Sequence, residues 1–259
     1  MQPFIVIIPA RQASTRLPGK MLADIAGVPM VVRVAQRAIT SGATDVIIAT
    51  DDAQIAQTAR SFGIKTLMTA SEHPSGTDRL AEAVEQLKLP DDAIVVNVQG
   101  DEPLIDPDLI QRVASLLAQH PVAAMSTCAA RIADAAHFFN PNVVKVVCDQ
   151  NGQALYFSRA PIPWDRDALT AGAQVLNPDI PALHHIGLYA YRVHFLKSFP
   201  RLQRGVLESI ESLEQLRALE HGYKIAVHLS NTCPAAGVDT QEDLDRVRLV
   251  LQTENGQSG

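Results

Sequence analysis

The fold is decided near the N-terminus by five apolar residues, Phe4-Ile5-Val6-Ile7-Ile8, and by the segment after them, Pro9-Ala10-Arg11-Gln12-Ala13-Ser14-Thr15-Arg16-Leu17-Pro18-Gly19-Lys20. A strand over Phe4–Ile8 would be apolar on both faces, as expected where helices cover a parallel sheet on each side. In open sheets of this kind, ligands bind beyond the carboxyl ends of the strands. The stretch therefore predicts an α/β fold whose first strand leads into a ligand-binding loop.

Short apolar runs alternate with helical patterns up to about residue 120. Further strands are predicted at 46–50, 65–68 and 93–98, and helices at 30–40, 53–62 and 77–87. Another helix should start at Asp106 or Pro107. This alternation is typical of a doubly wound, Rossmann-like, mostly parallel sheet.

After residue 120 the pattern becomes richer in strands. The turn Asp149-Gln150-Asn151-Gly152 predicts an antiparallel hairpin between strands at 143–148 and 154–158. Further on, we predict a surface excursion at 159–182, strands at 186–191 and 224–229, helices at 207–221 and 241–251, and a frayed tail at 254–259. One domain over 1–259, with a smaller strand-rich subregion, accounts best for this order.

The composition indicates a globular chain that does not bind nucleic acid. Its 259 residues are 47% hydrophobic and carry a net charge of -6, whereas sequence-independent nucleic-acid binding normally needs a basic face. The three cysteines, Cys128, Cys148 and Cys233, lack metal or redox spacing and are expected to be reduced thiols. No stretch has the length of a membrane span or the features of a signal peptide. A soluble, cytoplasmic protein is therefore expected.

The loop after the first strand suits a triphosphate. Arg11, Arg16 and Lys20 would offset its charge, and the small residues between them would let backbone N–H groups approach. The loop is not a P-loop, because Ser14 stands where the first glycine is required and Met21 replaces the Ser or Thr. The alternative is a solvated basic loop without a ligand.

Two aspartates are candidate ligands for Mg²⁺. Asp101 follows an apolar strand and Gly100, and Mg²⁺ commonly takes one or two carboxylates together with substrate phosphates. Asp239 stands just outside a predicted helix that Thr240 and Asp243 would cap, so capping does not explain it. The alternative for Asp101 is a helix cap, which is also our interpretation of the pair Asp51-Asp52.

The segment Pro74-Ser75-Gly76-Thr77-Asp78-Arg79 allows two interpretations. Ser75 or Thr77 would serve as an N-cap of the next helix. Alternatively, a base or ribose would approach the backbone at Gly76, with Arg79 directed at the ligand.

In the second half of the chain, each candidate binding residue also has an ordinary structural explanation. His185 and Tyr189 are more often core or surface residues than ligands. Glu211, Glu214 and Gln215 would share one helix face, which could be a solvated stripe. Arg159, in the excursion, could receive a substrate carboxylate through two hydrogen bonds.

Taken in order, these segments resemble the 3-deoxy-manno-octulosonate (Kdo) cytidylyltransferases, also called CMP-Kdo synthetases, over nearly the whole chain. The matching segments are 7–11, 13–20, 75–79, 96–103, 140–147, 154–160, 162–166, 185–189, 212–217 and 237–240. The first two are shared by many sugar nucleotidyltransferases, whereas 158–166 and 213–217 are more particular to the Kdo enzymes. Departures occur at Gln12, Pro74, Asp78 and the loop 167–182.

The resemblance implies transfer of CMP from CTP to Kdo, with release of pyrophosphate, for lipopolysaccharide biosynthesis. It implies a magnesium-dependent homodimer with a nucleotide-binding part at about 1–120, an acceptor-binding and dimerisation part at about 121–235, and a closing helix at about 240–252. The resemblance assigns the site residues as follows: Arg11, Arg16 and Lys20 to the triphosphate; Ser75 and Gly76 to the cytosine side; Gln99 and Arg79 to the junction of the substrates; Asp101 and Asp239 to Mg²⁺; Arg159, His185, Tyr189, Glu214 and Gln215 to the Kdo pocket.

Two alternatives stay open at this point. The acceptor would instead be a related acidic sugar, such as a sialic acid or an amino-sugar variant of Kdo. A catalytically silent nucleotide-binding or scaffolding protein is disfavoured, because both proposed metal carboxylates and all three phosphate cations are present.

Overall fold

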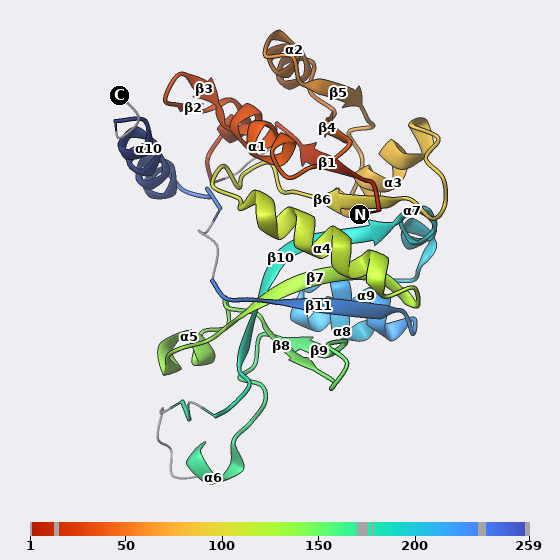
Figure 1. The fold of residues 1–259 in the computed structure, drawn as a ribbon, viewed down its shortest axis with the longest axis vertical. Coiled ribbons are helices and arrows are strands. Elements are labelled where there is room, and N and C mark those ends of the chain that lie inside the picture. The colour runs from red at the N-terminus through yellow and green to blue at the C-terminus, as the bar shows by residue number, and fades with distance from the viewer. Residues whose placement is uncertain (1, 13–15, 170–175, 178, 233–236, 257–259) are drawn as a thin grey trace.

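A large mixed sheet forms the centre of the computed structural model, which describes residues 2–12, 16–169, 176–177, 179–232 and 237–256 (Figure 1). Over these residues the main path of the sheet runs β11-β7-β10-β6-β1-β4-β5, and the hairpin β8–β9 is attached to β10. The strands of this sheet are β1 (Phe4–Ala10), β4 (Asp45–Thr50), β5 (Lys65–Met68), β6 (Ile94–Asn97), β7 (Ala123–Arg131), β8 (Lys145–Cys148), β9 (Ala154–Ser158), β10 (Leu183–Arg192) and β11 (Lys224–Ser230).

Helices cover the sheet on both faces. They are α1 (Met30–Ile39), α2 (Ala53–Ser61), α3 (Gly76–Gln86), α4 (Pro107–Gln119), α5 (Ala135–Phe139), α6 (Arg166–Leu169), α7 (Val193–Ser198), α8 (Val206–Glu211), α9 (Gln215–Glu220) and α10 (Gln241–Gly256), with 3-10 turns η1 (Lys20–Leu22) and η2 (Phe199–Arg201) and a small hairpin, β2 (Asp24–Ile25) and β3 (Val28–Pro29). Val6 and Ile8 of β1 belong to the core cluster that includes residues of α1, α2 and α4, whereas Ile7 belongs to the cluster that includes residues of α3, α7 and α9. This alternation explains why β1 is apolar throughout.

The parallel and antiparallel strand pairs confirm the predicted doubly wound sheet with a strand-rich subregion. β1 pairs in parallel with β4 and β6, and β4 pairs in parallel with β5. β10 runs antiparallel between β6 and β7. β8 and β9 form the predicted hairpin, whose turn is held by Asp149 through hydrogen bonds from the N–H groups of Asn151 and Gln153, both at 2.8 Å.

The order of the strands sets the place of the site. From β1 the chain moves to β4 and β5 on one side and then returns to β6 on the other side. The carboxyl ends of β1 and β6 therefore flank a crevice at the topological switch point, where α/β sheets bind ligands. The loops after these two strands carry the predicted phosphate residues and Asp101, whereas Asp239 stands just before α10.

The structure also corrects the predictions in the second half. The helix predicted at 207–221 is two helices, α8 and α9, because Ser212 adopts a left-handed conformation (φ 53°) that ends α8. Glu211 and Glu214 therefore do not share one helix face with Gln215. The last helix is longer than predicted: α10 continues to Gly256, beyond Leu251, its last buried anchor, and residues 257–259 of the predicted tail lie outside the described residues.

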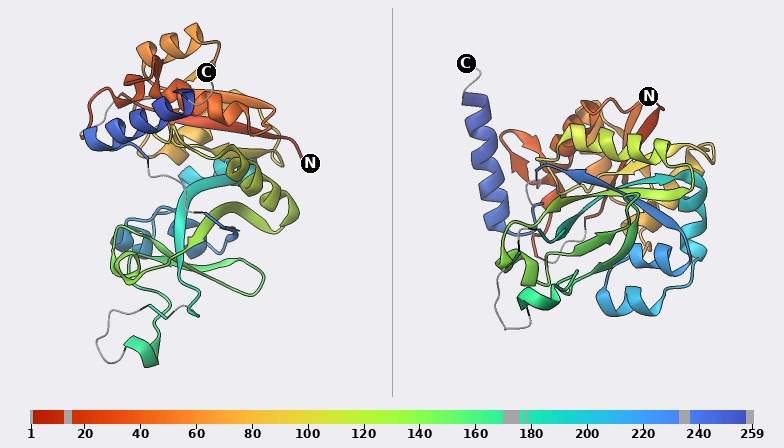
Figure 2. Two further views of the ribbon diagram at one scale, coloured as in Figure 1. Left: turned by 60° about the vertical axis from the view of Figure 1, so that its left-hand side comes forward. Right: turned by 60° about the horizontal axis from the view of Figure 1, so that its bottom comes forward.

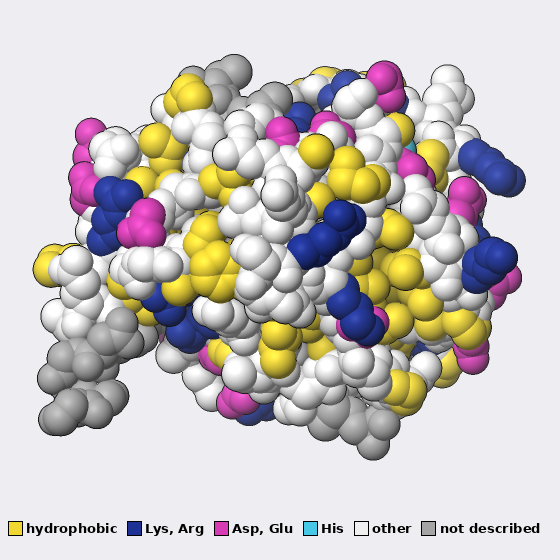
Figure 3. All heavy atoms as spheres, turned by 90° about the horizontal axis from the view of Figure 1, so that it is seen from above, with side chains coloured by type: hydrophobic (Ala, Val, Ile, Leu, Met, Phe, Trp, Pro, Cys, Tyr) yellow, Lys and Arg dark blue, Asp and Glu magenta, His cyan; other side chains and the backbone are white. Residues whose placement is uncertain are grey.

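Peripheral segments lie away from the sheet. The excursion between β9 and β10 carries α6 at the bottom of Figure 1, and α10 lies at one side of the molecule (Figure 2). On the face drawn in Figure 3, Lys and Arg side chains are interspersed with Asp and Glu, with hydrophobic groups between them. Within the described ranges, no helix combines the length and hydrophobicity needed to cross a bilayer.

Candidate functional site

One cavity of about 590 Å³ collects side chains from four separate parts of the chain. They come from the segment after β1, the start of α3, the loop after β6 and the residues before α10. The lining residues are Pro9, Ala10, Arg11, Arg16, Lys20, Met21, His73, Pro74, Ser75, Gly76, Arg79, Gln99, Gly100, Asp101 and Asp239. Every residue that the sequence assigned to the nucleotide or the metal lines this cavity.

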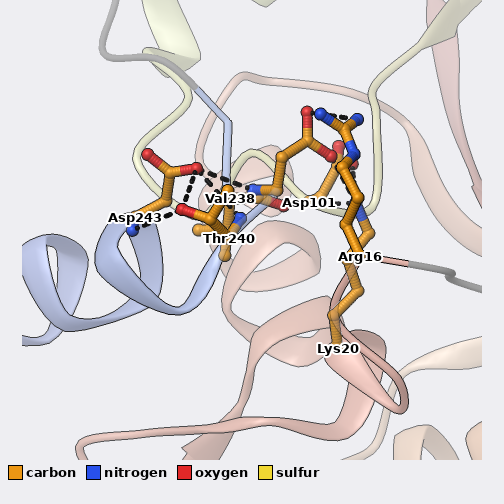
Figure 4. A network of polar contacts seen from close by, with 7 residues as sticks. Arg16, Lys20, Asp101, Val238, Thr240 and Asp243 are labelled. Atoms are coloured by element: carbon orange, nitrogen blue, oxygen red, sulfur yellow. Dashed lines mark hydrogen bonds and ion pairs between the residues drawn. The ribbon is translucent and has the colours of Figure 1, made fainter.

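The centre of the cavity is an ion network around Lys20. Its Nζ donates to Asp101 Oδ2 at 2.6 Å, to Asp239 Oδ1 at 3.0 Å and to the carbonyl of Val238 at 3.2 Å. Arg16 Nη2 lies 2.9 Å from Asp239 Oδ2. Figure 4 shows Arg16 and Lys20 converging with Asp101 and the residues that begin α10. Residues far apart in sequence thus meet at one point.

The two aspartates raise the pKa of Lys20. Burial alone would disfavour its charged form, but the hydrogen bonds and charges of Asp101 and Asp239 outweigh it, so the pKa lies above its ordinary value. The ammonium therefore stays charged. Its three hydrogen bonds are all directed at oxygen atoms, as a buried cation requires.

The same geometry tests whether the site fits Mg²⁺. Asp101 and Asp239 each place an oxygen within hydrogen-bond distance of one cation, so together they can contact a single small cation. Clusters of three or more metal-ligating side chains do not occur among the described residues, so other ligands would have to come from substrate oxygens and water. A pair of carboxylates completed in this way is a common Mg²⁺ site. The residues present fit the ion.

Two glycines let the backbone of the site adopt its path. A Cβ on Gly100 would lie 3.0 Å from Met21 Sδ and 3.1 Å from the Pro9 carbonyl oxygen, so the loop after β6 can pack this closely only without a side chain. Gly19 has φ +70°, a left-handed conformation that starts the turn carrying Lys20. These two positions bring Lys20 and Asp101 together.

The start of α3 has a capping residue and also borders the large cavity. Ser75 is the N-cap: its Oγ accepts from the N–H of Asp78 at 3.2 Å and donates to Asp78 Oδ2 at 2.6 Å. The capping alternative is therefore confirmed for Ser75. Ser75 and Gly76 also line the cavity, so the positive end of the α3 dipole faces it.

The side chain of Arg79 holds protein groups, although it lines the cavity. It is buried, its Nη1 donates to Thr69 Oγ1 and to the Ala70 carbonyl at 3.1 Å, and its Nη2 lies 3.3 Å from Asp51 Oδ2. Asp51 is therefore a partner of Arg79, and only Asp52 caps α2 as predicted. Both terminal nitrogens of the guanidinium group that was predicted to face the ligand are therefore bonded to protein oxygens.

A second, smaller cavity of about 50 Å³ contains three of the predicted acceptor residues. Thr77, Met125, Tyr189, Tyr191, Phe199, Glu214 and Gln215 line it. Thr77 Oγ1 donates to Glu214 Oε2 at 2.7 Å, which joins this cavity to the start of α3. Among the described residues, the buried atoms Glu214 Oε1 and Gln215 Nε2 have no hydrogen-bond partner. Unpaired buried polar atoms are costly, so they mark a place that a polar ligand would satisfy.

His185 lines neither cavity. It keeps 8% of its surface and packs edge-on against Phe157. Its Nε2 lies 3.0 Å from Thr127 Oγ1. The Thr127 hydroxyl has one proton, which it donates to the carbonyl groups of Ile186 and Leu188, at 3.0 and 2.8 Å. Nε2 is therefore the donor in this contact. Burial, followed by the charge of His184, lowers the pKa of His185 to about 3.

Arg159 also lies outside both cavities, and its hydrogen bonds are made within the protein. Its Nε donates to the Glu211 carbonyl at 2.7 Å and its Nη1 to the Pro141 carbonyl at 3.0 Å. The fully buried ammonium of Lys145 donates to the Arg159 carbonyl at 2.7 Å. In this conformation, Arg159 cannot present Nε and Nη1 to a substrate carboxylate.

Sequence reasoning missed several residues that face the site. His73, Met21 and Pro9 line the large cavity, and Tyr191 lines the small one. His73 stands directly before the selected segment 74–79, and its ionisable ring was the available signal. Tyr191 gave no signal, because its place depends on the register of β10 against β6.

Comparison with known proteins agrees with this geometry. The sequence pattern of the family described as Cytidylyltransferase matches residues 5–225. Relatives named 3-deoxy-manno-octulosonate cytidylyltransferase, from two strains of Neisseria gonorrhoeae, are 56% identical over 253 residues and cover 98% of this chain and 100% of their own length. A solved structure of CMP:2-keto-3-deoxy-manno-octonic acid synthetase complexed with CTP matches with a TM-score of 0.89 and 38% identity, over 98% of this chain and 100% of that one.

Proposed function

The chain belongs to the cytidylyltransferase family, and from this membership we propose that it transfers the CMP group of CTP to Kdo, giving CMP-Kdo and pyrophosphate. The observation that carries the proposal is the single cavity where Arg11, Arg16 and Lys20 meet Asp101 and Asp239. This cavity lies at the switch point of a sheet whose fold matches a CTP-bound synthetase.

The nucleotide would lie across the large cavity. Arg11, Arg16 and Lys20 would contact the triphosphate, since all three come from the segment after β1. Ser75 and Gly76 would face the cytidine. Arg79 is the one Lys or Arg residue in this part of the described lining, and its guanidinium group is bonded to the Ala70 carbonyl and to Asp51. The N-terminus of α3 adds a partial positive charge next to the nucleotide.

We propose that the reaction requires Mg²⁺, held by Asp101 and Asp239 together with phosphate oxygens. When bound there, the ion would offset charge on the attacking and departing oxygens. This proposal is supported by the positions of the two carboxylates, which both accept a hydrogen bond from the ammonium group of Lys20.

One end of the acceptor would enter the smaller cavity beside the start of α3, which at about 50 Å³ has room for a hydroxyl or carboxyl group of the sugar acid and not for the whole molecule. The unpaired atoms Glu214 Oε1 and Gln215 Nε2 are an acceptor and a donor, which suits the hydroxyl groups of a sugar acid. Gln99, in the loop after β6 and in the lining of the large cavity, would lie where the two substrates meet.

Catalysis would depend on position and charge. The anomeric hydroxyl of the sugar acid attacks the α-phosphorus of CTP and releases its proton to water, and the bond from the α-phosphorus to the pyrophosphate oxygen breaks. Arg11, Arg16 and Lys20 would stabilise the negative charge that accumulates on pyrophosphate. The chain needs no covalent intermediate, because the acceptor hydroxyl is itself the nucleophile.

Pyrophosphate release from CTP tests the proposal when Kdo, amino-Kdo and a sialic acid are offered in parallel. We expect turnover with Kdo, and turnover only with another sugar acid would refute the assignment of the acceptor. Asp101→Asn should lower kcat by at least about a thousandfold and leave the melting temperature nearly unchanged. A variant with near-normal magnesium-dependent turnover would refute the metal assignment.

We also propose a cytoplasmic homodimer that supplies lipopolysaccharide synthesis. CTP is a cytoplasmic nucleotide, and Kdo is a lipopolysaccharide sugar. On α8, within the part expected to dimerise, Val206 and Ile210 are 70% and 77% exposed, which suits an interface between copies. Analytical ultracentrifugation should give twice the mass of the chain, and Ile210→Glu should give the monomer.

A further inference from the structure

The loop between β5 and α3, residues 69–75, forms one wall of the large cavity. Its residues His73, Pro74 and Ser75 line the cavity, which is also lined by Arg11, Arg16 and Lys20 from the segment after β1. A wall without Lys or Arg is suited to the uncharged half of a nucleotide, the base and ribose. The position of this loop therefore bears on how the nucleoside is held.

The loop is fastened from outside the cavity by Glu82, on the second turn of α3. Glu82 Oε2 accepts a hydrogen bond from the backbone N–H of Ala70 at 2.9 Å and makes a close contact with His73 Nε2. Its other oxygen accepts from Gln86 Nε2 at 2.6 Å, which fixes the carboxylate in place. One side chain thus holds the loop at two points three residues apart.

Arg79 completes the attachment from the same face of α3, three residues before Glu82. It donates to the carbonyl of Ala70 at 3.1 Å, so the N–H and the C=O of Ala70 are both bonded to side chains of one helix. Arg79 is in turn anchored to Asp51 after β4. The loop is therefore tied to α3 and, through Arg79, to the sheet.

We propose that Glu82 is a positioning residue for nucleoside binding: by holding Ala70 and His73, it keeps the loop 69–75 against the cytidine half of CTP. Glu82 does not line the cavity, so it acts only through the loop. This inference rests on the proposed function for the identity of the nucleotide. It predicts a selective effect, since the phosphate half lies against a different wall.

Calorimetric titration of Glu82→Ala with CTP, CMP and pyrophosphate, each with Mg²⁺, tests the proposal. Loss of one charge-assisted hydrogen bond should raise the Kd for CTP and CMP about tenfold. The Kd for pyrophosphate, the kcat and the KM for Kdo should stay within about twofold. Glu85→Ala is the matched control, because Glu85 is exposed on the same helix, and it should behave as wild type.

Glu82→Gln, which keeps an acceptor for Ala70, should recover part of the affinity and serves if the alanine variant does not fold. The proposal is overturned if Glu82→Ala binds CTP as tightly as Glu85→Ala, or if pyrophosphate binding weakens as much as CMP binding. A wild-type protein that binds CTP but forms no product with Kdo would refute the proposed acceptor instead, since the binding comparison needs no sugar.

Discussion

Acidification should destabilise this protein partly through one buried imidazole, that of His185. Its Nε2 is committed as a donor to Thr127, so a second proton would have to enter at Nδ1, inside a packed aromatic environment that includes Phe157. Burial therefore lowers the pKa of His185 to about 3, against about 6.5 for an exposed histidine. Replacing His185 by Gln removes this titration and retains an N–H donor for Thr127.

The size of the effect follows from the two pKa values. Because the folded-state pKa is the lower one, the unfolded chain takes up the proton first as the pH falls. The stability contributed by the neutral imidazole is present above about pH 6.5 and is lost as the pH falls toward 3. Between pH 7.5 and 5.0, this loss amounts to about 2 kcal/mol of unfolding free energy.

Urea unfolding at pH 7.5 and 5.0 measures this quantity in wild type, His185→Gln and His194→Gln, the last being a control at an exposed imidazole. A comparison between proteins is needed, because burial and the charge of Asp101 raise the pKa of Glu102 to about 7 and make a contribution of opposite sign. The glutamine variant at 185 should lose about 2 kcal/mol less than wild type over this interval. Equal losses in the three proteins would refute the reasoning.

Two further predictions concern charged pairs. In the absence of nucleotide, Lys20→Met should increase the affinity for Mn²⁺ about tenfold, because the ammonium group no longer competes with the metal for Asp101 and Asp239. Electron paramagnetic resonance of free Mn²⁺ measures this affinity. An unchanged affinity would contradict the idea that the ammonium and the metal occupy the same position between the two carboxylates. Arg217→Met should lower the unfolding free energy by about 3 kcal/mol, because the side chain of Glu208, bonded to Arg217 at 2.6 and 2.7 Å, is only 4% exposed and would keep just the longer contact of 3.6 Å with Nε of the exposed Arg204. The double variant Glu208→Met, Arg217→Met should recover most of that loss in urea, and a double variant as unstable as the single would contradict this account.

The sequence predicts the first half of the fold well because its signals there are local. β5 is found at the predicted residues, and β1, β4 and β6 differ from the prediction by two residues or fewer at each end. The second half depends more on tertiary contacts. The strand β7 went unpredicted, since its run of Ala, Ser, Thr and Cys has small side chains and only its place between β10 and β11 makes it a strand. The break at Ser212 has no Gly or Pro to announce it.

In the candidate site too, some features follow from local sequence and others depend on tertiary packing. Arg11, Lys20 and Asp101 follow the ends of neighbouring parallel strands, so their meeting could be predicted from strand order alone. Arg79 and Arg159 stand in motifs that are equally recognisable, but their guanidinium groups bond to carbonyl groups and a carboxylate of the protein. A motif gives the residue type at a position, and only the packing decides whether the side chain faces a ligand or supports the residues that do.

The ion network gives a physical reason why a site for a polyanion and a site for a divalent cation can share one cavity. Two aspartates this close would repel each other strongly without a cation between them. Lys20 supplies that cation in the unliganded protein, and Arg16 adds a second one at Asp239. Binding of a nucleotide with its metal would exchange these partners: the carboxylates would gain a metal ion as the ammonium and guanidinium gain phosphate oxygens. Each group would keep an opposite charge throughout, so the cavity need not bury an uncompensated charge before or after the exchange.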